Sequence, residues 1–332
     1  MAVPPLVSIL IPAYNAERWM AETLTSVVSQ TWPNKEIIVV DDGSRDGTAA
    51  VAGRFASSSV KVVQQENRGP AVARNHAYRL AQGEYIQYLD ADDLLSPDKI
   101  AEQIKVLHDS PSHMLGICPW TYFQDGADPE KGLAENGWPC VDTDAPVEWL
   151  TELLGPEGRF GMVPPGAWLT PRTVAEKAGP WDETTPSPDD DGEYFFRVVL
   201  ASSGIRRAAG RFYYRKHRTG WSSTLNASQQ SGALHSLELK MHNLLARTGD
   251  ARAMRALANC FMQRAVQAYP DFPEIWRPAL QKVAALGGTD YVPPFGTREG
   301  ELFRRLFGWK AARRVQAIYH RCRQSTAKTL PQ

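Results

Sequence analysis

Three carboxylates follow an apolar strand pattern in "YIQYLDADD", residues 85–93. Asp90, Asp92 and Asp93 crowd within four residues, and like charges this close destabilise one another unless a cation lies between them. A hard divalent cation that holds a diphosphate uses one or two carboxylates together with phosphate oxygens. The cluster therefore predicts a Mg²⁺ or Mn²⁺ site that a nucleoside diphosphate completes. Solvated side chains ahead of a helix are the alternative.

A second pair of carboxylates also ends an apolar strand pattern. Asp41 and Asp42 lie in "VVDDGSRDGT", residues 39–48. An aspartate at this place can accept a hydrogen bond from the N–H of a pyrimidine base or from a ribose hydroxyl. Asp-Gly-Ser is equally typical of an ordinary turn, which the motif alone favours.

A third acidic run, "SPDDDGEYFFRVV" at residues 187–199, comes directly ahead of an apolar helical pattern. One of its carboxylates could take the proton of an acceptor hydroxyl, which accelerates such reactions by roughly 10²- to 10⁴-fold. The alternative is a set of charges that stabilises the helix N-terminus. In "YYRKHRTGWSST", residues 213–224, Arg215 and His217 could meet phosphate oxygens or could simply lie on a strand.

The elements that would position these motifs alternate along the first 108 residues. Apolar strand patterns alternate with helical patterns, and we expect Asn15 and Ser96 as helix caps and Gly83 as a helix stop. The strand patterns lie at residues 6–11, 36–40, 60–64 and 85–89. This order predicts an α/β domain whose largely parallel sheet is covered on both faces and binds ligands at the carboxyl ends of its strands. "PAYN", "DDGSRDG" and "DADD" fall there, and no G-x-G-x-x-G follows the first strand, which disfavours a dinucleotide fold.

The composition narrows the class of protein. The chain has 332 residues, of which 43% are hydrophobic, and a formal net charge of +0. These values allow a substantial core and give no global attraction for nucleic acid. The apolar runs are too short to span a bilayer, the start lacks a signal-peptide pattern, and the four cysteines show no metal-ligand spacing. We therefore expect a cytoplasmic protein that has no nucleic-acid partner.

The end of the chain is helical in pattern and strongly basic. Apolar residues recur at helical intervals beyond residue 225, and "LFRRLFGWKAARRVQAIYHRCRQ" at residues 302–324 interleaves them with Arg and Lys. Segments of this kind can lie on anionic membrane surfaces. We expect either a helix packed on the preceding domain or peripheral contact with the inner face of a membrane.

The three motifs in this order resemble those of the family 2 glycosyltransferases, inverting enzymes with the GT-A fold. The stretch from "VSILIPAYN" to "VVDDGSRDGT" is similar to their opening motif, "NRGPAVARNHAYRLAQGEYIQYLDADD" to the stretch that ends in their D-x-D, and "DDDGEYFFRV" to their "ED" stretch. The resemblance covers roughly residues 5 to 220. It implies a GT-A nucleotide-binding domain over 1–224, with a nucleotide-sugar half at 1–115 and an acceptor half at 116–224, followed by a helical region at 225–332.

The resemblance also implies roles for single residues. The loop that approaches the base and ribose corresponds to Pro12, Tyr14 and Asn15. The Asp that hydrogen-bonds the base corresponds to Asp42, with Asp41 as second choice. Arg74 corresponds to a residue that contacts the nucleotide or its phosphates. Asp90 and Asp92 fill the D-x-D positions, with Asp92 as the direct metal ligand. The catalytic base falls on Asp191. Asp190, which stands where Glu is usual, is the runner-up.

What the family does implies the reaction. A base on the acceptor side would deprotonate a hydroxyl while the nucleoside diphosphate leaves, and one displacement inverts the sugar. Processive members carry membrane helices and Q-x-x-R-W, which are missing here, so we expect single transfers from a nucleotide-sugar donor to a saccharide or lipid-linked acceptor. UDP or dTDP is expected as the nucleotide, in polysaccharide, glycolipid or other glycoconjugate biosynthesis.

Two alternatives and one specificity region complete the expectations. A nucleotidyltransferase would also use carboxylate-bound Mg²⁺ but usually carries a Gly-rich, Lys-containing loop where this chain has "IPAYNAE". An inactive scaffold that binds nucleotide sugars would keep the fold without turnover. Residues 116–190 are rich in Gly, Pro and Trp and predict long loops over a cleft that set specificity. The candidates for sugar stacking are Trp120, Trp138, Trp168 and Trp181, with burial as the alternative.

Overall fold

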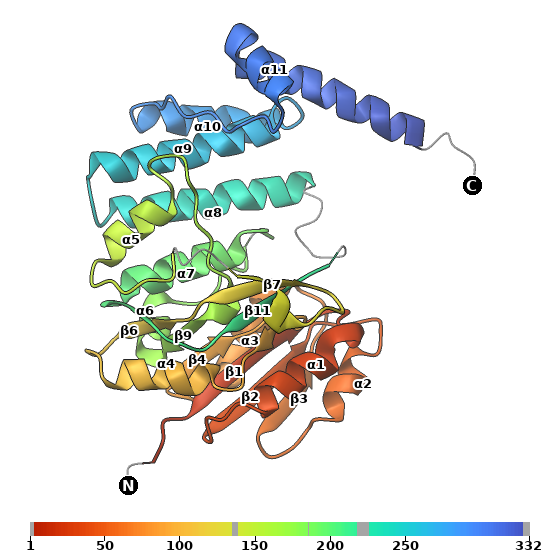
Figure 1. Cartoon of the computed structure of the whole chain (residues 1–332), viewed down its shortest axis with the longest axis vertical. Helices are drawn as coiled ribbons and strands as arrows, with labels where there is room; N and C mark the ends of the chain where they lie inside the picture. The colour runs from red at the N-terminus through yellow and green to blue at the C-terminus, as the bar shows by residue number, and fades with distance from the viewer. Residues whose placement is uncertain (1–2, 135–138, 185, 218–225, 328–332) are drawn as a thin grey trace. The chain divides into compact units, whose positions relative to one another are not determined.

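The computed structural model describes residues 3–134, 139–184, 186–217 and 226–327, with side chains as far as residue 319. The chain forms two compact units (Figure 1). One comprises Met1–Leu150 and Gly161–Thr224, and the other comprises Thr151–Phe160 and Leu225–Gln332. We describe each unit by itself.

The first unit is built on a mixed central sheet. Over the described residues this sheet has seven strands in the order β10-β6-β9-β4-β1-β2-β3. The bounds are β1 Val7–Ala13, β2 Lys35–Asp41, β3 Val60–Gln64, β4 Tyr85–Tyr88, β6 Met114–Ile117, β9 Trp168–Pro171 and β10 Gly204–Arg207. β1 pairs in parallel with β2 and β4, as the alternating pattern predicts, whereas β9 runs antiparallel to both β4 and β6. Every residue of β1 is buried, which places the core at the centre of this sheet.

Helices connect the strands much as the sequence predicts, but their ends differ. The helices of this unit are α1 Glu17–Val28, α2 Thr48–Gly53, α3 Pro70–Leu80, α4 Lys99–His108, α6 Arg172–Ala178 and α7 Asp190–Ala201. Asn15 does not cap α1, since Ala16 holds that place, and the N-cap position of α4 is Asp98 rather than Ser96, with no capping bond from its side chain. Gly83 lies beyond the end of α3, where a Cβ would come within 2.6 Å of the Ser8 backbone nitrogen. It is therefore required by close packing and not by a helix stop.

A second sheet replaces part of the expected long loops. Its described strands are β5 Leu94–Leu95, β11 Phe212–Lys216, β7 Trp120–Gln124 and β8 Leu133–Ala134, in the order β5-β11-β7-β8. The prediction of loops from residue 116 onward is wrong here, because β6, β7 and β8 occupy much of 114–134. Short strands between Gly- and Pro-rich turns leave little periodic signal. Since β11 pairs with β5 immediately after the Asp90 cluster, it carries Arg215 and His217 back to that cluster.

The second unit is helical. Its helices are α8 Ala227–Leu245, α9 Ala251–Ala268, α10 Pro273–Ala285 and α11 Arg298–Ala327, and α5 Pro146–Leu153 leads into its first segment. Asn226 and Gln229 form a capping box at the start of α8, and Asp250 caps α9. Side chains such as Phe261, Ile275 and Phe295 share one apolar cluster. None of the helices in the described part of the chain is long and apolar enough to cross a membrane.

Candidate active site

The three carboxylates after β4 have different partners. Asp90 accepts a hydrogen bond from Arg74, Asp92 pairs with His217, and Asp93 accepts the backbone N–H of Arg215. The side chains of Asp90 and Asp92 are 33% and 30% exposed, whereas Asp93 is only 3% exposed. Burial, with Asp92 and Asp90 nearby, raises the pKa of Asp93 well above its ordinary value. Asp90 and Asp92 are thus the two that a ligand can reach.

Arg74 joins the first carboxylate cluster to the third acidic run. From α3, its Nη2 donates to Asp90 Oδ1 at 2.9 Å and its Nη1 to Asp190 Oδ2 at 2.8 Å. The guanidinium lies over the Trp181 ring, 4.4 Å from its centroid. Although burial disfavours the cation, Asp190, Asp90 and Asp191 raise its pKa above the ordinary value. Arg74 is therefore a fixed positive charge between two motifs that are a hundred residues apart in the sequence.

Asp190 and Asp191 begin α7 and differ in their contacts. Asp190 is paired with Arg74, and its Oδ1 accepts the N–H of Asp191 at 2.8 Å. Asp191 Oδ1 accepts the N–H of Gly192 at 2.8 Å. Burial, followed by the negative charges of Asp190 and Asp189, raises the pKa of Asp191 to about 7. A carboxyl of this pKa can both gain and release a proton near neutral pH.

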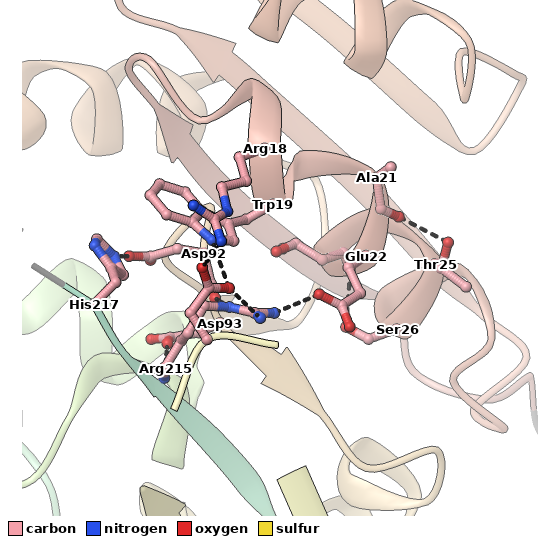
Figure 2. Close-up of polar contacts among 12 residues, drawn as sticks. Arg18, Trp19, Ala21, Glu22, Thr25, Ser26, Asp92, Asp93, Arg215 and His217 are labelled. Carbon is pink, nitrogen blue, oxygen red and sulfur yellow. Dashed lines mark hydrogen bonds and ion pairs between the residues drawn. The ribbon is translucent and has the colours of Figure 1, made fainter. Parts of the chain in front are cut away.

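Arg215 and His217 meet the Asp92–Asp93 turn from β11 and the residue after it (Figure 2). His217 Nε2 lies 2.7 Å from Asp92 Oδ2. Arg215 donates from Nε to the Asp92 carbonyl at 2.6 Å, from Nη1 to Asp125 at 3.1 Å and from Nη2 to Glu22 at 2.7 Å. Its side chain is 2% exposed. Two buried arginines, Arg74 and Arg215, therefore supply much of the positive charge that the carboxylates require.

The carboxyl end of β2 holds one engaged aspartate and one with an unpaired oxygen. Asp42 accepts hydrogen bonds from Gln65 Nε2 at 2.7 Å and from the N–H groups of Arg68 at 3.0 Å and Gly69 at 2.8 Å. These bonds fix the loop ahead of α3. Asp41 is 3% exposed, and its Oδ1 has no hydrogen-bond partner among the described residues. A buried oxygen without a partner is suited to accept an N–H or O–H from a ligand.

The loop after β1 is tied to the loop after β2. Pro12 lies buried within β1, opposite Val40. Tyr14 is 47% exposed. Asn15 has a positive φ of 49° and accepts the Arg45 N–H through Oδ1 at 2.8 Å. Tyr14 is thus an aromatic side chain that a ligand at this edge of the sheet can reach.

Three of the four tryptophans expected to stack on sugars lie in the core. Trp120, Trp168 and Trp181 are no more than 2% exposed, and Trp138 lies outside the described residues. The sequence interpretation missed Trp19, which stacks on His217 with ring centroids 4.2 Å apart. It also missed Tyr214, whose pKa is raised by burial and then by the charges of Asp93 and Asp90, so that its hydroxyl stays protonated. Nothing in the spacing of these residues marks them, since each is brought to the site by tertiary structure.

Comparison with known proteins identifies the family. The profile of "Glycosyl transferase family 2" matches residues 8–176, which is about half of the chain. The chain belongs to this family. The matched range contains the first two acidic motifs, and the third lies beyond it. The glycosyltransferase TuaG of Bacillus subtilis, named for teichuronic acid biosynthesis, is 41% identical over 106 residues, 31% of this chain and 42% of its own length. An uncharacterized glycosyltransferase of Haemophilus influenzae is 37% identical over 154 residues, 46% of this chain and 58% of its own length.

Solved structures confirm the fold. S. aureus TarS 1-349 in complex with UDP-GlcNAc superposes with a TM-score of 0.67 over 95% of this chain and 91% of its own, at 18% identity. The mannosyltransferase PcManGT from Pyrobaculum calidifontis, in complex with GDP-Man and Mn²⁺, gives a TM-score of 0.51 over 96% and 88%, also at 18% identity. The expected GT-A fold with a helical C-terminal part is therefore confirmed. The chain spans about half the length of the curated relatives named above.

Proposed function

We propose that this chain is an inverting glycosyltransferase that moves one sugar from a nucleoside-diphosphate sugar to an acceptor hydroxyl. The observation that carries the proposal is the Arg74 bridge. It brings Asp90, on the donor side, and Asp190, beside the candidate base, onto one guanidinium at 2.9 and 2.8 Å. Membership of the family supports the reaction class, and the bridge supports a single site in which donor and acceptor meet.

Asp191 is the proposed base. Its raised pKa of about 7 lets a large fraction be ionised at neutral pH while retaining enough basicity to take a hydroxyl proton. Asp190 is less suited, because its Oδ2 is held by Arg74. The deprotonated acceptor oxygen attacks the anomeric carbon as the diphosphate leaves from the opposite face. The sugar passes through an oxocarbenium-like state, and a single displacement inverts its configuration.

Donor binding is assigned to the carboxyl ends of β1, β2 and β4. Asp41 and Asp42 are proposed to contact the nucleotide base, and the unpaired Oδ1 makes Asp41 at least as good a candidate as Asp42. Tyr14 is proposed to face the base or ribose. UDP and dTDP fit an aspartate acceptor, and the UDP-GlcNAc bound to TarS supports UDP. The name of TuaG supports a saccharide acceptor in polysaccharide biosynthesis.

A divalent cation fits the donor side of the site. The described residues bring no three His, Cys, Asp or Glu side chains together as a ready-made metal cluster. Asp92 and Asp90 are nevertheless hard, partly exposed oxygen donors, and Mg²⁺ or Mn²⁺ needs only one or two carboxylates when phosphate oxygens complete its shell. They would hold Mn²⁺ or Mg²⁺, which would neutralise charge on the departing diphosphate. The Mn²⁺ in PcManGT supports this assignment.

Binding and turnover test the proposal separately. In thermal-shift measurements with UDP, dTDP, GDP and ADP, we expect a pyrimidine diphosphate to raise Tm, and more so with Mn²⁺. A ligand at a hundred times its Kd adds about 2.7 kcal/mol. Asp191→Asn should retain this shift but lose release of the nucleoside diphosphate from the sugar donor. Binding without turnover in the wild-type protein, whatever the acceptor, would instead favour the scaffold alternative. The absence of any nucleotide effect would contradict both.

Peripheral membrane contact is proposed for α11. Its exposed apolar side chains are Leu302, Leu306, Phe307, Val315, Ile318 and Tyr319. Arg305, Lys310 and Arg314 are exposed on the same segment, which a kink at Gly308 divides into two helical parts, so its surface combines apolar and positive groups. This charge favours an anionic lipid surface as the partner. Replacing Leu306 and Phe307 by Glu should abolish sedimentation with vesicles that contain phosphatidylglycerol. Unchanged sedimentation would contradict the proposal, and loss of a dimer instead would assign the surface to self-association.

A further inference from the structure

Trp19 makes a contact that the proposed reaction does not yet explain. Its ring, from α1, stacks on the His217 imidazole with centroids 4.2 Å apart and an interplanar angle of 26°. His217 Nε2 in turn lies 2.7 Å from Asp92 Oδ2. The imidazole is thus held on its face by Trp19 and at its edge by the carboxylate that we assign to the metal. Figure 2 shows these side chains turned toward one another.

A second connection runs from the same indole to the Asp92 backbone. Trp19 Nε1 donates to Asp125 Oδ1 at 3.0 Å, and Asp125 Oδ1 also accepts from Arg215 Nη1 at 3.1 Å. Arg215 Nε then donates to the Asp92 carbonyl at 2.6 Å. One side chain of α1 is therefore linked to Asp92 twice, through the carboxylate and through the main chain.

The main chain of Asp92 is more firmly restrained than its carboxylate. Arg215 fixes the Asp92 main chain from a buried position that also includes the Glu22 and Asp93 contacts. The Asp92 carboxylate is 30% exposed, and in the described part of the chain His217 is the side chain that hydrogen-bonds it. The imidazole in turn packs against the face of its aromatic neighbour, which limits its rotation. A ligand that needs this carboxylate therefore meets a group whose direction is set from α1.

We propose that Trp19 is a positioning residue of the donor site: its ring holds His217 against Asp92, and this arrangement sets the affinity for a metal-bound nucleoside diphosphate. The inference rests on the proposed function. Trp19 itself does not touch the substrate but acts through His217. Its indole N–H separately anchors Asp125, and a phenylalanine ring in its place removes that contact alone.

A double-mutant cycle on the full chain tests the inference by calorimetry. The probes are UDP, dTDP and GDP, each with and without Mn²⁺, and the one that binds the wild-type protein is used throughout. Trp19→Met removes the ring, and we expect the Kd in the presence of Mn²⁺ to rise about 3- to 10-fold, in line with an aromatic contact. Trp19→Phe keeps a ring and loses only the N–H, so its Kd should stay within about twofold. In a His217→Ala background, Trp19→Met should have no effect beyond the one that Trp19→Phe shows, because the ring has lost its partner and only the indole N–H contact with Asp125 remains to be removed.

Trp32→Met is the matched control. Trp32 is also half-buried, and its Nε1 donates to the Pro5 carbonyl at 3.0 Å, so its replacement removes a comparable side chain without touching His217. The Kd of this control should not change. Additive effects of Trp19→Met and His217→Ala, or an unchanged Kd in Trp19→Met, would overturn the inference. If Trp19→Met does not fold, Trp19→Phe still tests the inference. A Kd more than about twofold higher in Trp19→Phe would contradict it, because this variant keeps a ring against His217. If no nucleoside diphosphate binds the wild-type protein, the proposed function fails together with the inference.

Discussion

Asp190 and Asp191 are chemically identical neighbours whose surroundings separate their proposed roles. Burial raises the pKa of both carboxyls, but Arg74 holds the Asp190 carboxylate at 2.8 Å and opposes that rise, whereas the pKa of Asp191, which burial and adjacent negative charge raise, reaches about 7. The sequence located the acidic run at residues 187–199 and predicted that it takes part in the same reaction as Asp90. It could not predict the Arg74 bridge, because a contact between residues 74 and 190 depends on how α3 and α7 meet in space. The same limit hid the unpaired oxygen of Asp41 and the stacking of Trp19 on His217.

The protonation of Asp191 predicts a pH profile. A base must be ionised to act, so kcat/KM should rise with pH up to about 7 and then level off. Asp191→Asn should lower kcat by roughly 10²- to 10⁴-fold without weakening the binding of the donor. Asp189→Asn is the matched control: it removes a charge that raises the pKa of Asp191, and should keep turnover with the rise shifted to lower pH. A profile of the same midpoint in Asp189→Asn would contradict the assignment.

The raised pKa of Asp191 also predicts that the folded state is less stable at neutral pH than at acidic pH. The folded pKa of about 7 lies above the ordinary carboxyl value of 3.8, so the folded state binds more protons than the unfolded state between these values. Stability therefore falls as pH rises from about 4 to 7, and the loss is complete above 7. Asp191→Asn should raise Tm at pH 8 and change it little at pH 4, measured by calorimetry without ligand. Equal shifts at both pH values would show that this charge is not the cause.

At the scale of elements, the pairing of β11 with β5 assembles the donor side. The strand patterns of β1 and β2 were evident from sequence because buried strands are nearly continuous in apolar residues. β5 has only Leu94 and Leu95, too short for any periodic signal, yet its register with Tyr213 and Phe212 delivers Arg215 to the Asp92–Asp93 turn. The sequence thus named Arg215 but could not predict that its guanidinium would be buried among Asp125, Glu22 and the Asp92 carbonyl.

The contacts of the Arg215 guanidinium form a junction between β11, the Asp92–Asp93 turn and α1. Removing that guanidinium should lower the free energy of unfolding substantially. Arg215→Met removes a buried guanidinium together with its bonds to the Asp92 carbonyl and to Asp125, and the loss of a hydrogen bond made by a charged group costs about 1.5 to 3 kcal/mol. Glu22→Gln removes an outer partner whose side chain is 59% exposed, and should cost no more than about 1 kcal/mol. Urea unfolding of both variants measures the difference. Similar losses in the two would mean that burial of Arg215 is not what makes the junction stable.

At the scale of the whole molecule, the chain packs two cores. The helices of the second unit follow a 3.6-residue period that sequence reasoning detects, but residues 151–160 belong to that unit through long-range contacts. Asn259 donates to the carbonyls of Gly155 and Pro156, and Phe160 packs against Tyr291. Local patterns carry no record of such contacts. The first core likewise contains a charge that no hydrophobic pattern reveals, since Lys99 is 0% exposed.

Because Lys99 is buried, the free energy of unfolding should increase with pH in the alkaline range. Its ammonium donates to Gln87 Oε1 and, at 3.1 Å, to the Trp168 carbonyl, which joins α4 to the central sheet. Burial lowers its pKa from 10.5 to about 8, so between these values the unfolded state binds more protons than the folded state. Stability should therefore rise with pH across this window, by about 3 kcal/mol in total. Lys99→Met should remove this rise when the free energy of unfolding is measured by urea titration from pH 8 to 10. The difference between the two proteins cancels the contribution of other titrating groups, such as Lys35, whose pKa is also lowered by burial. Equal slopes in the two proteins would mean that Lys99 keeps its proton inside the core, held by Gln87 and Trp168 more strongly than burial opposes it.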